Sequence, residues 1–385
     1  WQSVIADFSN ENTESDGEGI PALPAWLSRI ELIIDSVVVN TNNTWHNFKV
    51  LYNATTNKPL FVNSDEMNFT FIKKEGVANL NFGFLSWNSD TSDDVSSSKV
   101  APFSAKQIPN MRLSVDQLYF NGKPYGDWQL TITSDGDVVR VDPISSKLKT
   151  GRFTGSLFWQ DRGEASNVEL VVTADGTDLA ELTQKFSNEA IVTSKNYKID
   201  VGLSWKGHPF YFDRESASGR IAFSASNGNF SQVNELPPFL KALGIFNVGA
   251  LSRRLLLDFS DVYEPGLTYD EFTGVLSIDD GILKTASPIT IKSPTAELVV
   301  AGEADIVNEV LNEKLTATFP LTGTLPLAGL LWGTPQLAGL LFITDKLIGD
   351  QLSKVTSVQY KVEGAFSDPV ITPVRYQPLG KSNDK

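Results

Sequence analysis

The sequence contains no cysteine, only two histidines, and no run of basic residues longer than two. The absence of cysteine excludes disulfides, thiolate metal sites and thiol catalysis, and it favours a periplasmic or surface protein over a cytosolic one that happens to lack cysteine. His46 and His208 do not have the His-Glu-x-x-His spacing of a zincin site. A net charge of −14 without a positive stripe argues against nucleic-acid binding.

Motifs of the common enzyme classes are also missing. There is no P-loop and no Gly-x-Ser-x-Gly elbow, and the segment Gly17–Ala22 matches the dinucleotide pattern only in its letters, because it follows an acidic loop. The pairs Asp93-Asp94 and Asp279-Asp280 are typical of solvated turns. We therefore expect no enzyme, no catalytic residue, no cofactor and no bound metal, while a hydrolase with two carboxylates stays open as a minor alternative.

Alternation of apolar and polar residues dominates the chain. In Tyr197–Trp205 every second residue is apolar, which is the pattern of a half-buried strand. Pairs such as Asp135-Gly136, Asn227-Gly228 and Asp280-Gly281 separate many of the strands and indicate tight turns. The sequence therefore predicts a mainly β protein with an antiparallel meander.

Helical patterns are few. Asp178–Phe186 and Pro237–Leu251 each place apolar residues on one helical face. The uncharged stretch Leu325–Ile343 is interrupted by prolines, which favours two short apolar helices within 326–354, the second running over Gln336–Lys354. These helices would plug the end of a sheet or dip into a membrane surface. Their apolar residues are Leu327, Leu330, Leu331, Trp332, Leu337, Leu340, Leu341 and Phe342.

The one-sided apolar strands outnumber the helices that could cover them. A sheet must bury its apolar face against a second sheet, against itself or against a ligand. Acyl chains would need no precise polar constellation, but alternation alone does not distinguish an open trough from a closed core. The side chains expected to line a hydrophobic groove are Leu113, Val115, Val168, Leu170, Val172, Ile199, Val201, Leu203, Ile221, Phe223, Leu276, Ile278, Leu298, Val300, Leu315, Ala317, Val358 and Tyr360.

An ordered series of short motifs occupies Leu236–Pro373. It comprises Ala250-Leu251-Ser252-Arg253-Arg254-Leu255, Tyr269-Asp270-Glu271-Phe272-Thr273-Gly274, Ile291-Lys292-Ser293-Pro294-Thr295-Ala296 and Tyr360-Lys361-Val362-Glu363-Gly364-Ala365-Phe366-Ser367-Asp368-Pro369. The series resembles the C-terminal region of the AsmA-like family, of the YhdP type. Leu157-x-Trp159 fits the preceding region of that family more loosely, and the first hundred residues resemble the family only in their general pattern.

The resemblance implies a long curved antiparallel sheet that forms an open hydrophobic groove, with a few short helices including the apolar C-terminal pair. It divides the chain into β-groove segments at 1–110 and 111–235, a C-terminal segment at 236–376 and a flexible tail at 377–385. It also implies a periplasmic part of a bridge protein, held in the inner membrane by an N-terminal helix absent from this chain.

The function implied by the resemblance is conduction of phospholipids to the outer membrane. The expected partners are phospholipid acyl chains and either the inner leaflet of the outer membrane or a protein at that end, with a monomeric chain and no nucleic acid. An extracytoplasmic structural β protein that binds a protein or glycan partner is the alternative.

Overall fold

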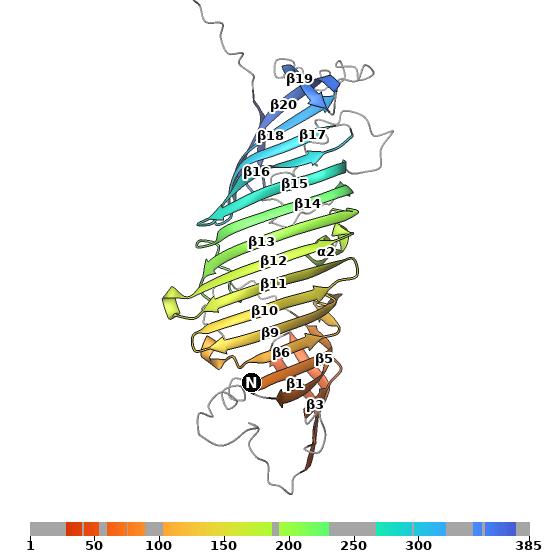
Figure 1. Ribbon diagram of the computed structural model, residues 1–385, viewed down its shortest axis with the longest axis vertical. Helices are drawn as coiled ribbons and strands as arrows, with labels where there is room; N and C mark the ends of the chain where they lie inside the picture. The colour runs from red at the N-terminus through yellow and green to blue at the C-terminus, as the bar shows by residue number, and fades with distance from the viewer. Residues whose placement is uncertain are drawn as a thin grey trace, which may run out of the picture. The chain divides into compact units, whose positions relative to one another are not determined.

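A computed structural model of the chain describes residues 28–40, 42–53, 60–74, 76–88, 103–186, 192–230, 267–294, 296–320, 342–348 and 351–374. The described strands belong to one sheet that is dominated by antiparallel pairs, with β5 parallel to β6 and β7 (Figure 1). The prediction of a mainly β protein is confirmed. The chain divides into two compact units, Trp1–Ala174 with Gly202–Asp213 (unit 1) and Asp175–Val201 with Arg214–Lys385 (unit 2).

Unit 1 contains a series of strands and two short 3₁₀ helices. The strands are β1 (Arg29–Asn40), β2 (Asn43–Asn53), β3 (Leu60–Asn63), β4 (Met67–Lys74), β5 (Val77–Trp87), β6 (Met111–Val115), β7 (Leu118–Phe120), β8 (Lys123–Pro124), β9 (Asp127–Asp135), β10 (Val138–Lys147) and β11 (Gly151–Gln160), and the helices are η1 (Ala105–Gln107) and η2 (Gly163–Ala165). Residues of β12 (Asn167–Gly176) and β13 (Asn196–Lys206) belong to both units.

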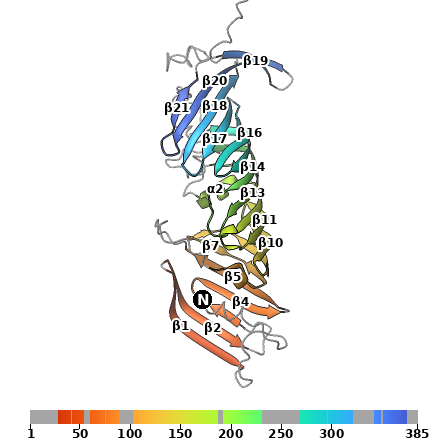
Figure 2. The same cartoon turned by 90° about the vertical axis from the view of Figure 1, so that its left-hand side faces the viewer.

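Unit 2 also consists mainly of β-strands, and its described residues contain one α-helix, α2 (Leu179–Phe186). Its further strands are β14 (Ser218–Phe230), β15 (Leu267–Asp279), β16 (Ile282–Lys292), β17 (Glu297–Asp305), β18 (Val310–Pro320), β19 (Phe342–Ile348), β20 (Gln351–Ala365) and β21 (Val370–Pro373). The strands β14, β15, β16, β17 and β18 pair with one another in this order. Beyond them, β20 pairs with β18 on one side and with β19 and β21 on the other (Figure 2).

Two of the three predicted turns are confirmed. Asp135 ends β9 and Gly136 begins the turn to β10. Asp280-Gly281 joins β15 to β16 with φ values of 46° and 74°, the left-handed pair that a two-residue hairpin requires. The prediction for Asn227-Gly228 is wrong, because both residues lie inside β14. Asn227 has a φ of 52° there, yet the register with β15 continues on both sides, so this residue is a local distortion of a continuous strand.

The predicted helix at Asp178–Phe186 is confirmed as α2, where the Ala180 N–H donates to Asp178 Oδ1 at 2.9 Å and caps the first turn. The predicted helix Pro237–Leu251 lies outside the described residues. The predicted helix over Gln336–Lys354 is wrong for its described residues, since Phe342–Ile348 form β19 and 351–354 belong to β20.

Backbone pairing explains that correction. Phe342 lies opposite Ser357 and Ile348 opposite Gln351, so the polar backbone groups of β19 are satisfied across strands. An apolar run without a clear period does not distinguish a helix from a strand. Of the apolar residues assigned to the helix pair, Phe342 lies in β19, and the others, Leu327, Leu330, Leu331, Trp332, Leu337, Leu340 and Leu341, lie outside the described residues.

Close packing at Gly228 gives a test of the fold of unit 2. A Cβ atom at this position would overlap the carbonyl oxygen of Thr193 and lie 2.6 Å from Tyr269 Cζ, where the Tyr269 hydroxyl donates to that carbonyl at 2.6 Å. We expect Gly228→Ala to lower the free energy of unfolding by about 1–3 kcal/mol through overpacking. Gly202→Ala, with no atom within 4 Å of its Cβ, is the control for denaturant unfolding. Equal midpoints for both variants would contradict this packing.

Candidate functional site

The apolar residues of unit 2 align across strands on one face of the sheet, called here its inner face. Ile221 lies opposite Leu276, and Val300 lies opposite Leu315, which in turn lies opposite Tyr360. Leu276, Val300 and Leu315 are at most 3% exposed. The register places further predicted groove residues on the same face, namely Phe223, Ile278, Leu298, Ala317 and, by its backbone, Val358.

The two predicted groove residues of β13 in unit 2 are less enclosed. Ile199 and Val201 are half-buried, and they alternate along the strand with the same phase as the buried Tyr197. Burial raises the pKa of Tyr197 to about 12, so its hydroxyl stays neutral. This part of β13 therefore carries an apolar phase, but with less burial than β15 to β18.

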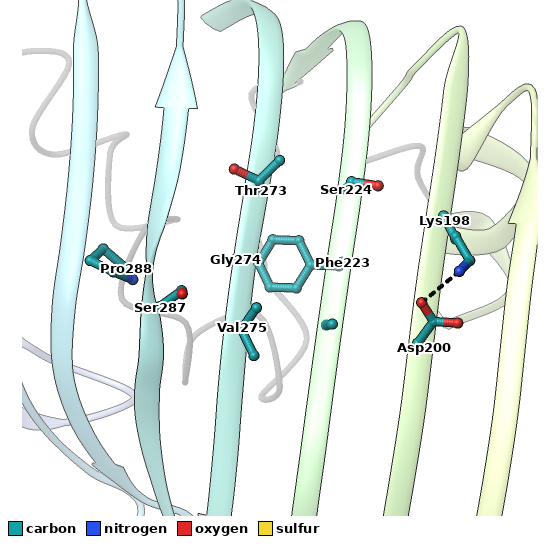
Figure 3. A pocket seen from close by; sticks show the side chains of 10 residues that line it. Lys198, Asp200, Phe223, Ser224, Thr273, Gly274, Val275, Ser287 and Pro288 are labelled. Carbon is teal, nitrogen blue, oxygen red and sulfur yellow. Dashed lines mark ion pairs between the residues drawn. The ribbon is translucent and has the colours of Figure 1, made fainter.

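A shallow depression lies on the sheet of unit 2, and Figure 3 shows the side chains that line it. The Phe223 ring reaches toward Gly274, where a Cβ atom would lie 2.6 Å from Phe223 Cζ. Lys198 Nζ and Asp200 Oδ2 form an ion pair of 3.0 Å beside it. Since Asp200 is the one carboxylate in the lining and is ion-paired, the depression lacks the two carboxyl groups that glycoside hydrolysis requires.

The opposite face of unit 2 carries paired charges. Lys284 Nζ lies 3.2 Å from Glu303 Oε1 across β16 and β17, and Lys292 Nζ lies 2.6 Å from Glu271 Oε2 across β15 and β16. These side chains are about half exposed. The two faces of the unit 2 sheet therefore differ in chemistry, one being apolar and buried and the other charged and hydrated.

Glu313 is an exception to this division. It alternates with Leu311 and Leu315 on β18 and belongs to the inner face, where it is 4% exposed. Its Oε2 atom has no hydrogen-bond partner, and burial raises the pKa of its carboxyl to about 8. Glu313 was not among the predicted site residues, although a charged residue in the apolar phase of a strand can be recognised in the sequence.

Unit 1 also has an apolar inner face. Val168 and Leu203 pack with Val139, Trp159 and Trp205 in one cluster, and the predicted groove residue Leu170 packs against it. Two further predicted residues, Leu113 and Val115, lie opposite Leu130 and Trp128 of β9 on this face, and Val172 lies beside Gly155 of β11. The structure thus brings the predicted groove residues of each unit together on a common face.

Part of the inner face of unit 1 is covered by residues 103–108, which we call the strap. Ala105 is fully buried in the Trp159 cluster, and Phe103 and Ile108 pack against it. The Ala105 N–H donates to Asp161 Oδ2 at 2.9 Å, and the Ser134 hydroxyl donates to the Ala105 carbonyl at 3.2 Å. The strap was not predicted, because three apolar residues at irregular spacing give no periodic signal.

The second histidine of the chain serves packing in this cluster. The His208 ring lies 4.7 Å from the Trp159 ring and 4.9 Å from the Phe103 ring, centroid to centroid, and the residue is 6% exposed. Burial lowers the pKa of His208, so the imidazole is neutral at pH 7. Two aromatic residues that follow His208 in the same loop, Phe210 and Phe212, are 69% and 46% exposed.

Neither a metal site nor a membrane-spanning helix is found in the described part of the chain. No group of three or more histidine, aspartate or glutamate residues there could hold a metal ion. Within the same residues no helix is both long and apolar enough to cross a membrane.

Comparison with known proteins finds similarity over most of the chain. The family described as YhdP protein matches residues 1–371. The chain is 23% identical over 348 residues to a protein of Escherichia coli (strain K12) named "Intermembrane phospholipid transporter YhdP", and the alignment covers 88% of this chain and 27% of that protein. The chain therefore spans about a quarter of the length of this relative. No solved structure matches the chain significantly.

Proposed function

Because this chain belongs to the YhdP family, we propose that it binds and conducts phospholipid along the apolar inner faces of its sheet. It is a lipid carrier and not an enzyme. In this proposal the chain is a periplasmic part of a bridge between the inner and outer membranes, and acyl chains lie on the inner face while head groups stay in water.

The observation that carries the proposal is the alignment of apolar side chains across successive strands. In unit 2 Ile221 lies opposite Leu276. On β17, Val300 lies between Ile289 and Leu315, and Leu315 lies opposite Tyr360. Transfer of an acyl chain from water to such a surface is favourable by about 0.8 kcal/mol for each buried CH₂ group. A row of similar side chains also offers neighbouring positions of similar affinity, which allows a chain to move along it.

The relative's name supports the substrate class. That protein is named as an intermembrane phospholipid transporter, and this chain aligns with it over most of its own length. Flow toward the outer membrane, a monomeric state and contact of residues 326–354 with the outer-membrane end belong to the same proposal, and so does the assignment of individual groove residues.

Lipid that copurifies with the chain provides the test. We expect mild, detergent-free purification followed by native mass spectrometry to find phospholipid bound to the chain, because acyl chains leave water when they bind to an apolar surface. Extraction with organic solvent identifies the lipid. A chain that carries no lipid after this procedure, and takes up none from phospholipid vesicles, would contradict the proposal.

A further inference from the structure

We propose that Glu313 is a phospholipid contact in which its protonated carboxyl donates a hydrogen bond to an ester carbonyl oxygen of the lipid. This inference rests on the proposed function, since it assumes that lipid occupies the inner face of unit 2.

The position of Glu313 supports a role toward a ligand. It lies opposite Gly302 on β17 and opposite Val362 on β20, within the row of residues that faces the proposed lipid. The residue is 4% exposed, and Oε2 finds no partner in the protein. A buried polar group without a partner destabilises a fold, so its presence on an otherwise apolar face points to a partner that arrives with the ligand.

The backbone beside Glu313 makes room for this side chain. Gly302 has a φ of 155°, and a Cβ atom there would lie 2.6 Å from Glu313 Cα and 3.1 Å from Glu313 Cβ. The Gly302 N–H donates instead to the Thr285 hydroxyl oxygen at 3.0 Å, where the ladder between β16 and β17 is irregular. Any residue other than glycine would collide with β18 at Glu313, so glycine at position 302 lets the two strands approach closely there.

Among the side chains that the structure describes on the neighbouring strands, no cation faces Glu313. On β17 and β20 the charged side chains Glu303, Lys361 and Glu363 alternate to the opposite face, as does Lys314 on β18 itself. The titratable group that shares the inner face beside it is Tyr360, whose pKa burial raises to about 12. Burial raises the pKa of the Glu313 carboxyl to about 8, so this group is protonated at pH 7.

The protonated state determines which lipid atoms suit it. A neutral carboxyl group donates one hydrogen bond and accepts others. Ester carbonyl oxygens are the polar lipid atoms closest to the acyl chains, and they accept hydrogen bonds without bringing a charge onto an apolar face. A phosphate would bring a buried charge that the described inner face does not neutralise.

The experiment measures phospholipid binding to the full chain as a function of pH. The chain and its variants are incubated with vesicles of phosphatidylglycerol or of phosphatidylethanolamine between about pH 6.5 and pH 9 and re-isolated, and the bound lipid is quantified. We expect wild-type binding to weaken about tenfold over this range, because the carboxyl ionises near pH 8. Glu313→Gln keeps a donor that does not ionise, so its binding should be independent of pH.

Two more variants complete the design. Glu313→Leu removes the donor and should bind lipid about threefold to tenfold more weakly than wild type at pH 6.5. Lys314→Gln, on the opposite face of the same strand, is the matched control and should behave as wild type. Circular dichroism confirms that every variant is folded.

The outcomes separate this inference from the proposed function. If wild type binds no lipid at any pH, the proposed function fails. If wild type binds lipid but Glu313→Leu binds equally well at pH 6.5, or wild-type binding does not change with pH, the inference alone is wrong. Binding that requires phosphatidylethanolamine and is lost in Glu313→Gln would also overturn it, because an ammonium group would then be the partner.

Discussion

Arginine in place of Leu170 is expected to abolish phospholipid loading and transport, whereas arginine in place of the adjacent Val171 is expected to leave both unchanged. Leu170 is half-buried and packs against the Trp159 cluster on the inner face of unit 1. Val171 belongs to the other face of β12 and is 57% exposed. A guanidinium group on the inner face would have to be desolvated by each passing acyl chain, at a cost of several kcal/mol.

The two substitutions introduce the same charge one residue apart, so a general effect of charge or of strand propensity would affect both. Bound phospholipid is quantified in the purified variants, and transport is measured between donor and acceptor vesicles or by complementation in cells. Unfolding midpoints establish that both variants fold. Normal loading of a folded Leu170→Arg variant would show that the inner face of β12 is not a lipid path.

Glutamine in place of Glu313 is expected to stabilise the protein, by an amount that grows with pH. Burial raises the pKa of Glu313 to about 8, so between pH 4.5 and pH 8 the folded state holds a proton that the unfolded state has released. The unfolded state then binds fewer protons, and stability falls as pH rises through this window. At 1.36 kcal/mol per pH unit, the loss by pH 7 is about 3 kcal/mol, and the Gln variant avoids it.

Denaturant unfolding of wild type and Glu313→Gln at several pH values tests this expectation. The two proteins should have similar stability at about pH 4, where the glutamate is protonated in both states, and should diverge steadily up to about pH 8. A Gln variant that is less stable than wild type at pH 7 would mean that Glu313 is ionised and paired in the folded protein. A stabilised Gln variant would show that the glutamate carboxyl lowers the stability of the fold at pH 7.

The strands could be predicted from the sequence because their apolar phase is a local property. Leu298 and Val300, or Leu315 and Ala317, show the period of two within a few residues, and the structure places each pair on a buried face. The register between strands follows from that phase, since a shift by one residue would expose every apolar side chain. The apolar face that carries the candidate site could therefore be predicted from the sequence.

Other features depended on contacts that a local pattern does not contain. The hairpin of Phe342–Ile348 with β20 was predicted as a helix, because a short apolar run fits either structure until its hydrogen-bond partners are known. The strap could not be predicted, because Ala105 is buried in a cluster whose other members, such as Trp159 and Trp205, lie far along the chain. Glu313 could have been found by extending the phase of Leu315 and Ala317 by one step toward the N-terminus.

The strap has a kinetic consequence for the proposed transport. Because Ala105 is fully buried against Val139 and Val168, an acyl chain cannot occupy that part of the unit 1 face while the strap is in place. Passage must wait for an opening that breaks the hydrogen bonds to Asp161 and Ser134 and briefly hydrates the cluster. The rate of flow through unit 1 is therefore expected to follow the frequency of this local opening, with a steep temperature dependence, and to be insensitive to acyl-chain length.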